Sequence, residues 1–330
     1  MRLIIPMAGR GTRLRPHTHV TPKPLLPVLG SSMVERIVTT FTELLPNQVQ
    51  EAVFILGDFP TEVRDQLRLI CRRLGIKASF AVQDKAMGTA HALYCAKEYL
   101  EGEVFSIFAD TLFYMEPDFK LDSDVVAWVK LVEDPRAYGV VVRDKQGRAV
   151  GFVEKPTELI SREALIGIYY IKDGARLKQV IQDMMDEKAL SLRGEYELPD
   201  AFDRMLQNGA TLDTATVTDW LDCGTLPALL DTTKIVMQKE RSAFRGNLTN
   251  TVIIEPVYIG PGALIRNSVI GPFASIEAGA TITDSIVRDS IVFSNATIEG
   301  AMIKDSFVGQ HAFVKGFATP INVGDHASVG

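Results

Sequence analysis

The feature that most constrains this chain is a regular spacing of aliphatic residues near its C-terminal end. From about residue 252 they recur at steps of five or six residues, and small residues and turn formers fill the intervals. This spacing is typical of hexapeptide repeats that build a parallel β-helix, whereas strands of an ordinary β-sandwich are spaced at about 8 to 12 residues. The recurring positions are Ile253, Ile259, Ile265, Ile270, Ile276, Ile282, Val287, Val292, Ile298, Ile303, Val308 and Val314.

Three such steps make one triangular coil, as in the 17 residues that separate Ile253 from Ile270. We therefore predict a left-handed parallel β-helix over residues 247–330. Ahead of it, Leu226 to Phe244 has a charged helical pattern, which predicts a connecting helix within residues 225–246. Because a solenoid with an exposed side can dock on its copy, we expect a homo-oligomer, with the β-helix as the candidate interface.

Residues 1–246 have a different pattern and are predicted to form a separate domain. Short apolar runs alternate there with segments in which apolar residues recur every three or four positions. This alternation predicts a doubly wound, Rossmann-like α/β domain with a mixed sheet. The predicted strands are Leu3 to Met7, Ala52 to Leu56, Ala78 to Val82, Val104 to Phe108, Val125 to Val132, Tyr138 to Val142, Val150 to Glu154 and Thr211 to Val217. The predicted helices are Val34 to Leu45, Glu62 to Leu74, Thr89 to Leu100, Ala175 to Met185 and Glu197 to Gln207.

Charge and cysteine content argue against several classes of protein. With 35 basic and 41 acidic residues the net charge is −6, so we expect no general attraction to nucleic acid or to an anionic membrane. The three cysteines are widely spaced and form no CxxC pair, which argues against a zinc site or a disulfide framework. The first apolar run is too short for a signal sequence and no run is long enough to span a membrane, so we expect a cytoplasmic protein.

The residues that carry the most chemical information follow the first predicted strand. Gly9 to Pro16, with the sequence GRGTRLRP, lies at the carboxyl end of that strand, where open α/β sheets bind ligands. The run is not a Walker A loop, since GxxxxGK[ST] is absent, and it is not the dinucleotide-binding fingerprint GxGxxG, because Leu14 stands at the position of the third glycine. Its glycines let backbone N–H groups approach an anion, and Arg13 and Arg15 offer guanidinium groups to phosphate oxygens. Pro22-Lys23-Pro24 adds an ammonium on a stiff backbone, and the combination suggests a polyphosphate site.

The combined pattern GxGTRLxPxTxxxPKPLxPV, present here as Gly9 to Val28, resembles the sugar-1-phosphate nucleotidyltransferase family, the NDP-sugar pyrophosphorylases. The resemblance implies a GT-A-like catalytic domain, and the β-helical tail makes the chain similar to the long-form glucose-1-phosphate thymidylyltransferases. Further motifs of the family follow in the same order. They are Gln83, Gly88-Thr89-Ala90-His91-Ala92, Asp110, Tyr138-Gly139, Glu154-Lys155-Pro156, Gly167-Ile168-Tyr169 and Trp220-Leu221-Asp222-Cys223-Gly224-Thr225.

The resemblance implies that a sugar phosphate oxygen attacks the α-phosphorus of a nucleoside triphosphate in line and that pyrophosphate leaves. Such a reaction needs positioning and charge neutralisation more than a protein nucleophile. By resemblance Arg13 binds the β- and γ-phosphates, Lys23 binds the α-phosphate, and Asp110 and Asp222 hold Mg²⁺, which prefers oxygen ligands. Ala109-Asp110-Thr111 stands where the family often has Gly-Asp-Asn, and the aspartate that metal binding needs is kept.

The resemblance also assigns residues to the two substrates. Gln83 offers a donor and an acceptor for the edge of a pyrimidine, and Gly88 leaves room for the base. Lys155 neutralises the sugar phosphate, while Glu154 accepts hydrogen bonds from sugar hydroxyls. The nucleotide-binding set is Ala8, Gly9, Gly11, Thr12, Arg13, Lys23, Gln83, Gly88 and Thr89, and the sugar-phosphate-binding set is Gly139, Glu154, Lys155, Gly167 and Tyr169.

The predicted substrates are dTTP and glucose 1-phosphate, which would give dTDP-glucose. UTP with glucose 1-phosphate and GTP with mannose 1-phosphate stay open as alternatives. Hexapeptide β-helices also occur in acyltransferases, for which His311 and His326 are the candidate bases in the tail. A third alternative is a non-catalytic sugar-nucleotide sensor, against which the complete set of phosphate- and metal-binding residues argues.

Overall fold

The computed structural model describes residues 1–191, 193–240, 243–244, 246–316 and 320–330. By its internal contacts the chain divides into two compact units. Unit 1 consists of Met1–Gly9 and Ile37–Trp220, and unit 2 consists of Arg10–Arg36 and Leu221–Gly330. The segment rich in glycine and arginine that follows the first strand therefore belongs to the same unit as the C-terminal region. The sequence instead predicts a single domain for all of residues 1–246.

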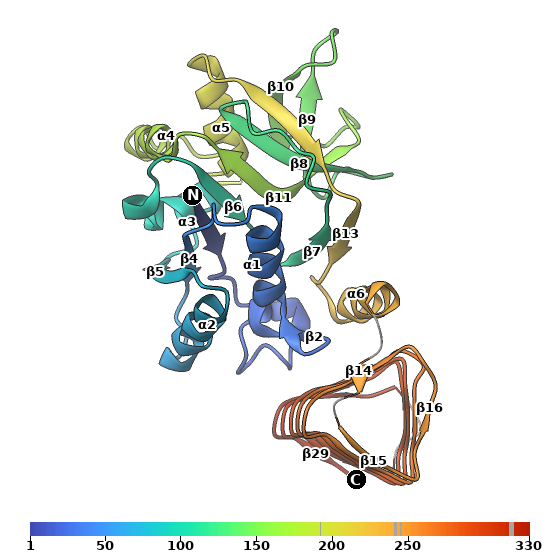
Figure 1. Ribbon diagram of the computed structural model, residues 1–330. Helices are drawn as coiled ribbons and strands as arrows, with labels where there is room; N and C mark the ends of the chain where they lie inside the picture. Colours follow the sequence, from blue (N-terminus) through green and yellow to red (C-terminus); the bar gives the residue numbers. More distant parts are fainter. Residues whose placement is uncertain (192, 241–242, 245, 317–319) are drawn as a thin grey trace. The chain divides into compact units, whose positions relative to one another are not determined.

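Unit 1 contains a mixed sheet (Figure 1). Its strands are β1 (Arg2–Pro6), β4 (Glu51–Leu56), β5 (Lys77–Val82), β6 (Val104–Ile107), β8 (Val125–Leu131), β9 (Gly139–Arg143), β10 (Ala149–Glu154), β11 (Glu163–Ile171) and β12 (Leu212–Thr216). Their order is β10-β9-β11-β6-β1-β4-β5, with β8 paired to β11 and β12 paired to β8. The β6-β1-β4-β5 part is parallel, and β11 runs antiparallel to β6, β8 and β9. The predicted doubly wound mixed sheet is confirmed.

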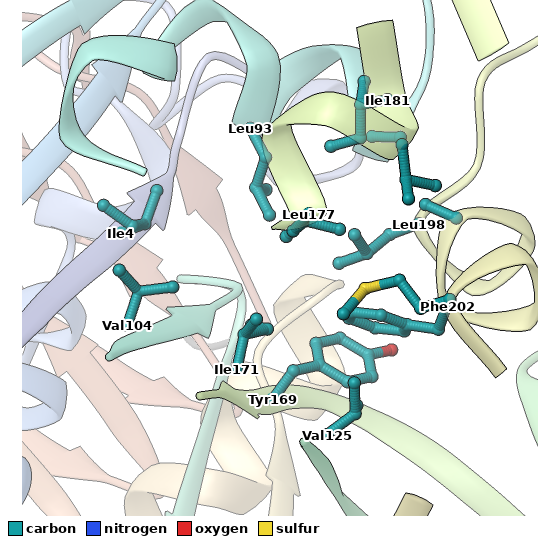
Figure 2. Packing of buried hydrophobic residues seen from close by; sticks show 14 of the residues in the cluster. Ile4, Leu93, Val104, Val125, Tyr169, Ile171, Leu177, Ile181, Leu198 and Phe202 are labelled. Carbon is teal, nitrogen blue, oxygen red and sulfur yellow. The ribbon is translucent and has the colours of Figure 1, made fainter. Parts of the chain in front are cut away.

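Helices α3 (Thr89–Cys95), α4 (Gly174–Asp186) and α5 (Leu198–Gln207) pack against one another, and α2 (Thr61–Arg73) packs against β5. Figure 2 shows the core under the first three helices, where Ile4, Val104 and Ile171 from the sheet lie near Leu93 and Leu177 from the helices. The central strands β1, β4 and β6 are buried along most of their length, which explains their continuous apolar sequences.

Several elements differ from the sequence prediction. Strand β11 lies in the middle of the sheet but was not predicted as a strand, because Gly167 interrupts its apolar run at a register shift in the pairing with β8. The helix predicted over Thr89 to Leu100 ends at Cys95 and is followed by the 3-10 turn η3 (Lys97–Tyr99). Short elements were also missed: η1 (Thr12–Leu14), η2 (Lys23–Leu25), β2 (Pro27–Val28), β3 (Ser31–Ser32), β7 (Thr111–Tyr114) and β13 (Asp219–Asp222). Helix α1 spans Met33–Leu44, close to its predicted range.

Unit 2 contains a parallel β-helix, which Figure 1 shows as a triangle formed by three sheets of described strands. The first sheet is β14 (Ala243–Phe244), β17 (Val257–Ile259), β20 (Ala274–Ile276), β23 (Ser290–Val292), β26 (Phe307–Val308) and β28 (Asn322–Val323). The second sheet is β15 (Asn247–Thr249), β18 (Leu264–Arg266), β21 (Thr281–Thr283), β24 (Thr297–Glu299), β27 (Phe313–Lys315) and β29 (Ser328–Val329). The third sheet is β16 (Val252–Ile253), β19 (Val269–Ile270), β22 (Ile286–Arg288) and β25 (Met302–Lys304).

The predicted repeat positions form the interior of this β-helix. All twelve aliphatic residues belong to one apolar cluster, and eleven of them are buried, whereas Ile253 is partly buried. Strands one coil apart pair in parallel, first at a separation of 17 residues, as for Val252 and Val269, and later at 16, as for Thr281 and Thr297. The prediction of a β-helix is confirmed, and the triangular coil is consistent with the left-handed form.

The predicted connecting helix, by contrast, is too long. Helix α6 spans Leu226–Lys239, and the Thr225 side chain caps its N-terminus by accepting a hydrogen bond from the Ala228 N–H. Ala243–Phe244 is a strand that pairs with Tyr258 and Ile259, so the β-helix begins before residue 247. The parts of this prediction at residues 241–242 and 245 lie outside the described residues. No helix within the described part of the chain is long and apolar enough to cross a membrane.

Candidate active site

The parallel strands of unit 1 end at one edge of the sheet, where open α/β sheets bind ligands. Ala8 follows β1, Gln83 follows β5, and the exposed Asp110 follows β6. The backbone is crowded at this edge, since a Cβ atom on Gly57 would lie 2.8 Å from the Ala8 carbonyl oxygen. Around Gly9, the last residue of unit 1, no described atom beyond its two chain neighbours lies within 4 Å of the corresponding position. The edge is therefore crowded at Gly57 but open at Gly9.

A histidine orients the predicted base-reading residue, Gln83. The Gln83 N–H donates to the Leu56 carbonyl oxygen at 2.8 Å, which fixes its backbone to the end of β4. Its side-chain Nε2 lies 3.3 Å from Nδ1 of His91, on α3. Burial lowers the pKa of His91, which favours a neutral ring that can accept this hydrogen bond at Nδ1. In this arrangement the Gln83 amide oxygen is left to accept from another donor.

A chain of charged side chains joins two of the predicted sets. The buried Glu197, just before α5, accepts a hydrogen bond from the Thr89 hydroxyl at 3.0 Å. Nη1 of Arg193 lies 3.5 Å from Oε1 of Glu197 and 4.0 Å from Oε1 of Glu154. Nζ of Lys155 lies 3.6 Å from that same Glu154 oxygen. The structure thus brings together Thr89 from the nucleotide set and Glu154 and Lys155 from the sugar-phosphate set.

Glu197 and Arg193 were missed in the sequence analysis, although a signal was present. The run from Arg193 to Glu197 carries three charged residues directly before an apolar helix, a weak signal that does not tell which of them is buried. Burial raises the pKa of Glu197, and the nearby Glu154 charge raises it further, whereas the Thr89 hydroxyl and Arg193 lower it. Its Oε1 makes no hydrogen bond with a described residue. A carboxyl group in this state can exchange a hydrogen bond with a polar ligand.

Two predicted glycines are needed for packing within the protein. Gly88 has a φ of +109°, and a Cβ atom there would lie 2.4 Å from the Tyr196 carbonyl oxygen. A Cβ atom on Gly167 would lie 2.6 Å from the Phe108 ring. Side chains at these positions would displace a backbone segment and an aromatic ring, whatever ligand lies nearby. Both positions therefore require glycine for packing, in addition to the ligand contacts that the resemblance implies.

The other sugar-phosphate residues lie at different depths. A Cβ atom on Gly139 would lie 2.8 Å from Oε2 of Glu154, so this glycine makes room for the carboxylate. Lys155 is exposed at the end of β10. Tyr169 is almost completely buried, with its ring 5.1 Å from that of Phe202, and Figure 2 shows it among the core residues. Burial raises the pKa of Tyr169, so its hydroxyl stays protonated.

In unit 2 the residues from Gly11 to Lys23 fold back on themselves. The Gly11 carbonyl oxygen accepts hydrogen bonds from the Leu14 N–H at 2.9 Å and from the Thr18 hydroxyl at 2.8 Å. Gly11 has a φ of +59°, and a Cβ atom there would lie 2.8 Å from Cβ of Lys23. Only glycine lets the stem of Lys23 pass this close. Lys23 is 7% exposed, whereas Thr12, at the start of η1, is exposed.

The structure also brings Arg13 and Asp222 together, although they lie far apart in the sequence. A Cβ atom on Gly224 would lie 2.8 Å from Oδ1 of Asp222 and 3.3 Å from Nη2 of Arg13. The Gly224 N–H donates to that Asp222 oxygen at 2.7 Å. Both charged side chains are exposed. Gly224 therefore keeps the space beside a carboxylate and a guanidinium free of any side chain, as a site for a phosphate and its metal ion requires.

The two predicted metal ligands lie in different units, Asp110 in unit 1 and Asp222 in unit 2. Within the described residues, no group of three or more His, Cys, Asp or Glu side chains could hold a metal ion. The prediction asks for only two carboxylates, because Mg²⁺ commonly completes its shell with phosphate oxygens and water. Asp222 suits such a role, since it is exposed and one of its oxygens is held by the Gly224 N–H.

Comparisons with known proteins point to one family. A family model described as nucleotidyl transferase matches residues 3–239, a range that contains every predicted site residue. The bifunctional protein GlmU of Methanococcus maripaludis is 29% identical over 269 residues, which cover 81% of this chain and 62% of that protein. This chain thus matches less than two thirds of the length of that relative.

Two further similarities extend the comparison. A glucose-1-phosphate thymidylyltransferase of Streptomyces griseus is 26% identical over 322 residues, which cover 90% of this chain and 88% of that protein. A crystal structure of a UDP-glucose pyrophosphorylase complexed with UDP-glucose superimposes with a TM-score of 0.59 at 18% identity. It covers 72% of this chain and 99% of its own, which is a similarity of fold.

Proposed function

The chain belongs to the nucleotidyl transferase family, and we propose that it transfers a nucleoside monophosphate from a nucleoside triphosphate to a sugar 1-phosphate. A phosphate oxygen of the sugar phosphate attacks the α-phosphorus. The bond between the α-phosphorus and the oxygen that bridges to the β-phosphorus breaks, and pyrophosphate leaves. The observation that carries the proposal is that Arg13, on the motif that follows the first strand, meets Asp222 beside Gly224.

The phosphate chemistry is assigned to the loop residues. Arg13 binds the β- and γ-phosphates and stabilises the departing pyrophosphate, and Lys23 neutralises charge that develops on the α-phosphate. The buried stem of Lys23, held against Gly11, limits the positions that its ammonium can take. Gly9, Gly11 and Thr12 supply backbone N–H groups to the same phosphates. A positioned cation is worth more than a mobile one, because it needs little reorganisation during the reaction.

A magnesium ion is the cofactor we propose, with Asp110 and Asp222 as its protein ligands. Bound to the triphosphate, it would neutralise charge on the reacting phosphates. The donor set agrees with this assignment, because both side chains are exposed carboxylates and hard oxygen ligands are those that Mg²⁺ prefers.

The sugar phosphate is assigned to the residues around β10. Lys155 pairs with the phosphate, and Glu154 accepts hydrogen bonds from sugar hydroxyls. Glu197 joins this set, because its carboxyl group is linked through Arg193 to Glu154 and has an oxygen without a hydrogen bond to a described residue. Tyr169 belongs to the same predicted set of sugar-phosphate residues, and its ring is buried in the core of unit 1. Gly139 makes room for Glu154.

For the substrates we propose dTTP and glucose 1-phosphate, with UTP and glucose 1-phosphate or GTP and mannose 1-phosphate as alternatives. Support for the first pair comes from the thymidylyltransferase of Streptomyces griseus, which is similar over 90% of this chain. The amide of Gln83, with its oxygen left to accept, can pair with the N3–H of a pyrimidine. Thymine and uracil both offer this N3–H, and guanine offers an N1–H to the same oxygen, so the contact alone does not separate dTTP from UTP or GTP.

The experiment is a substrate matrix. Purified protein with Mg²⁺ is incubated with glucose, mannose, galactose and N-acetylglucosamine 1-phosphates against dTTP, UTP, GTP, CTP and ATP, and pyrophosphate release is measured. One strongly preferred pair, lost on chelation of the metal, is expected. Lys23→Ala and Asp222→Asn should each reduce kcat by roughly 100-fold or more. Lys85→Ala, which changes an exposed lysine outside the assigned set, is the matched control.

If folded wild-type protein released no pyrophosphate with any substrate pair, the transferase proposal would be overturned and the sensor alternative favoured. Calorimetry with sugar nucleotides would then test that alternative. Consumption of acetyl-CoA with an amino-sugar phosphate would instead support an acyltransferase tail. If Lys23→Ala retained full kcat, the assignment of the α-phosphate to that lysine would be wrong.

A further inference from the structure

The first sheet of the β-helix carries a ladder of outward-facing residues that is unusual for the surface of a solenoid. Parallel pairing places Tyr258, Ser275, Ile291, Phe307 and Asn322 in one row across successive coils. Each of the first four has neighbours in its own strand that point into the core, so the row itself faces outward. Even so, the side chains of Ser275, Ile291 and Phe307 are at most 5% exposed. The outer face of this sheet is therefore covered.

One covering contact comes from His17. This residue belongs to the segment of residues 10–30 that is predicted to bind phosphate, which we call the loop. The His17 side chain is completely buried, and its ring lies 5.1 Å from that of Phe293 and 5.8 Å from that of Phe307. Nε2 of His17 is 2.7 Å from Oδ1 of Asn322. Burial lowers the pKa of His17, which favours the neutral ring that donates from Nε2 to the amide oxygen. A Cβ atom on Gly324 would lie 2.9 Å from Cβ of Pro16, so the β-helix backbone and the loop are in close contact here.

A second contact lies toward the other end of the ladder. The Gly30 N–H donates to Oε1 of the buried Glu277 at 3.2 Å, and the Ser275 hydroxyl donates to the same oxygen at 3.1 Å. A Cβ atom on Gly30 would fall within 1.9 Å of the Tyr258 hydroxyl oxygen. The segment that carries Arg13 and Lys23 is therefore held on the β-helix at two points, which lie on either side of Lys23 in the sequence and which both follow Arg13.

Helix α6 is held on the β-helix as well. Nζ of Lys234 lies 3.0 Å from Oδ1 of Asp289, which is at a corner of the β-helix. On the same helix, the Thr232 hydroxyl donates to the Asp222 carbonyl oxygen at 2.6 Å. The strand end that carries Asp222 is thus connected through α6 to the same β-helix that holds the loop.

We propose that the β-helix positions the phosphate-binding residues Arg13, Lys23 and Asp222, and that His17 and Glu277 are positioning residues for the reaction. This inference rests on the proposed transferase function and gives the tail a task beyond assembly. The loop has little regular structure of its own besides short turns, so without the β-helix its order would cost conformational entropy when substrate binds. Contacts formed before binding remove that cost and keep the cations near the place where charge develops.

The sharpest test adds one methyl group to the β-helix. In Gly324→Ala the new Cβ atom meets the ring of Pro16, which is attached to the loop backbone and cannot rotate away, so the loop must shift. A misplacement of about 1 Å can reduce activity roughly 100-fold. We expect kcat/KM for the nucleotide to fall at least tenfold, with a much smaller change in KM for the sugar phosphate. Gly330→Ala is the matched control, because its methyl group makes only an ordinary contact 3.5 Å from Cβ of Lys315.

A pair of substitutions at His17 separates positioning from general stability. His17→Leu removes the donor to Asn322 and should produce the same loss in kcat/KM for the nucleotide. His17→Gln keeps a donor and should recover much of that loss. Ile298→Val, in the core under the second sheet, lowers stability without touching the loop and should leave all kinetic constants near those of the wild type.

Hydrogen exchange of the full-length protein gives a readout that needs no activity. Backbone amides of residues 10–30 should exchange faster in Gly324→Ala and His17→Leu than in the wild type, Gly330→Ala or Ile298→Val. If exchange and nucleotide kinetics were unchanged in folded Gly324→Ala and His17→Leu, the positioning role would be refuted. If the wild type had no transferase activity while exchange increased as expected, the proposed reaction would fail and the anchoring of the loop would stand.

Discussion

The first and second sheets of the β-helix share one solenoid and one repeat, yet their outer faces differ. On the second sheet the outward positions are exposed or half-buried and mostly polar, as at Thr281, Thr297 and Lys315. On the first sheet the row through Ile291 and Phe307 is buried, and His17 lies against Phe307. One outer face of the solenoid is therefore an interface within the protein, whereas the other faces solvent. A repeat that is uniform in the core can thus have outer faces with different functions.

A charge placed on the covered face should have the strongest consequence for stability. Phe307→Asp should lower the free energy of unfolding by about 4 kcal/mol, because it removes a buried ring and buries an unpaired carboxylate. Thr297→Asp, at an outward position of the second sheet, should change it by about 0.5 kcal/mol at most. Urea denaturation of both variants measures the difference. Equal losses would mean that the two faces are not distinguished in solution.

Inward positions should not distinguish the two sheets. Ile276 belongs to the first sheet and Ile282 to the second, and both are fully buried in the same cluster. Truncation of either to alanine should cost about 3 kcal/mol, from lost apolar contacts and the cavity that remains. The check is again urea denaturation, with Ile282→Val as a milder step that should cost about 1 kcal/mol. A difference of more than about 2 kcal/mol between the two alanine variants would show that the loop, and not the core alone, sets the stability of the first sheet.

The last expected difference concerns pH and Glu277, on the covered side. Burial raises the pKa of Glu277 from 4.5 to about 7, while its hydrogen bonds and the Arg36 charge lower it in part. Between these two values the folded protein keeps a proton that the unfolded chain has lost, so the free energy of unfolding falls as pH rises from 4.5 to about 7. Glu277→Gln removes this loss, which should make the variant up to about 3 kcal/mol more stable relative to the wild type at pH 8 than at pH 4.5.

Stability curves from pH 4.5 to 8 test this prediction, with the exposed Glu299→Gln as the control. Parallel curves for the wild type and Glu277→Gln would show that this carboxyl group is not held in a buried position. Because glutamine keeps the oxygen that accepts from the Gly30 N–H, the variant should retain the anchor of the loop at every pH.

Much of the fold could be predicted because its signals are local. The continuous apolar runs predict the buried strands β1 and β4, and the aliphatic repeat from Ile253 to Val314 predicts the β-helix. Each pattern is formed by residues close together in the sequence. Strand β11 was not predicted, because its central position depends on pairing with β6 and β8, which lie far away in the sequence. The end of α6 was placed too late because Ala243–Phe244 is a strand only through its pairing with Tyr258 and Ile259.

The candidate site divides in the same way. Arg13, Lys23 and Asp222 stand in motifs that the sequence displays, so their chemistry could be proposed before any geometry was known. Glu197 could not be selected, because its importance comes from burial beside Thr89 and from its link through Arg193. Burial and charge pairing across distant segments are properties of the folded chain, which a single sequence expresses only weakly.

The two architectures and the chemical groups of each motif could be predicted from local patterns, because hydrophobic periodicity and turn residues act over a few neighbouring positions. The packing of residues 10–36 with the C-terminal region, and the contacts of His17 and Gly30 with the β-helix, became evident only in the folded chain. Contacts between segments separated by hundreds of residues depend on how complementary surfaces meet after folding, and no local pattern encodes the identity of the partner surface.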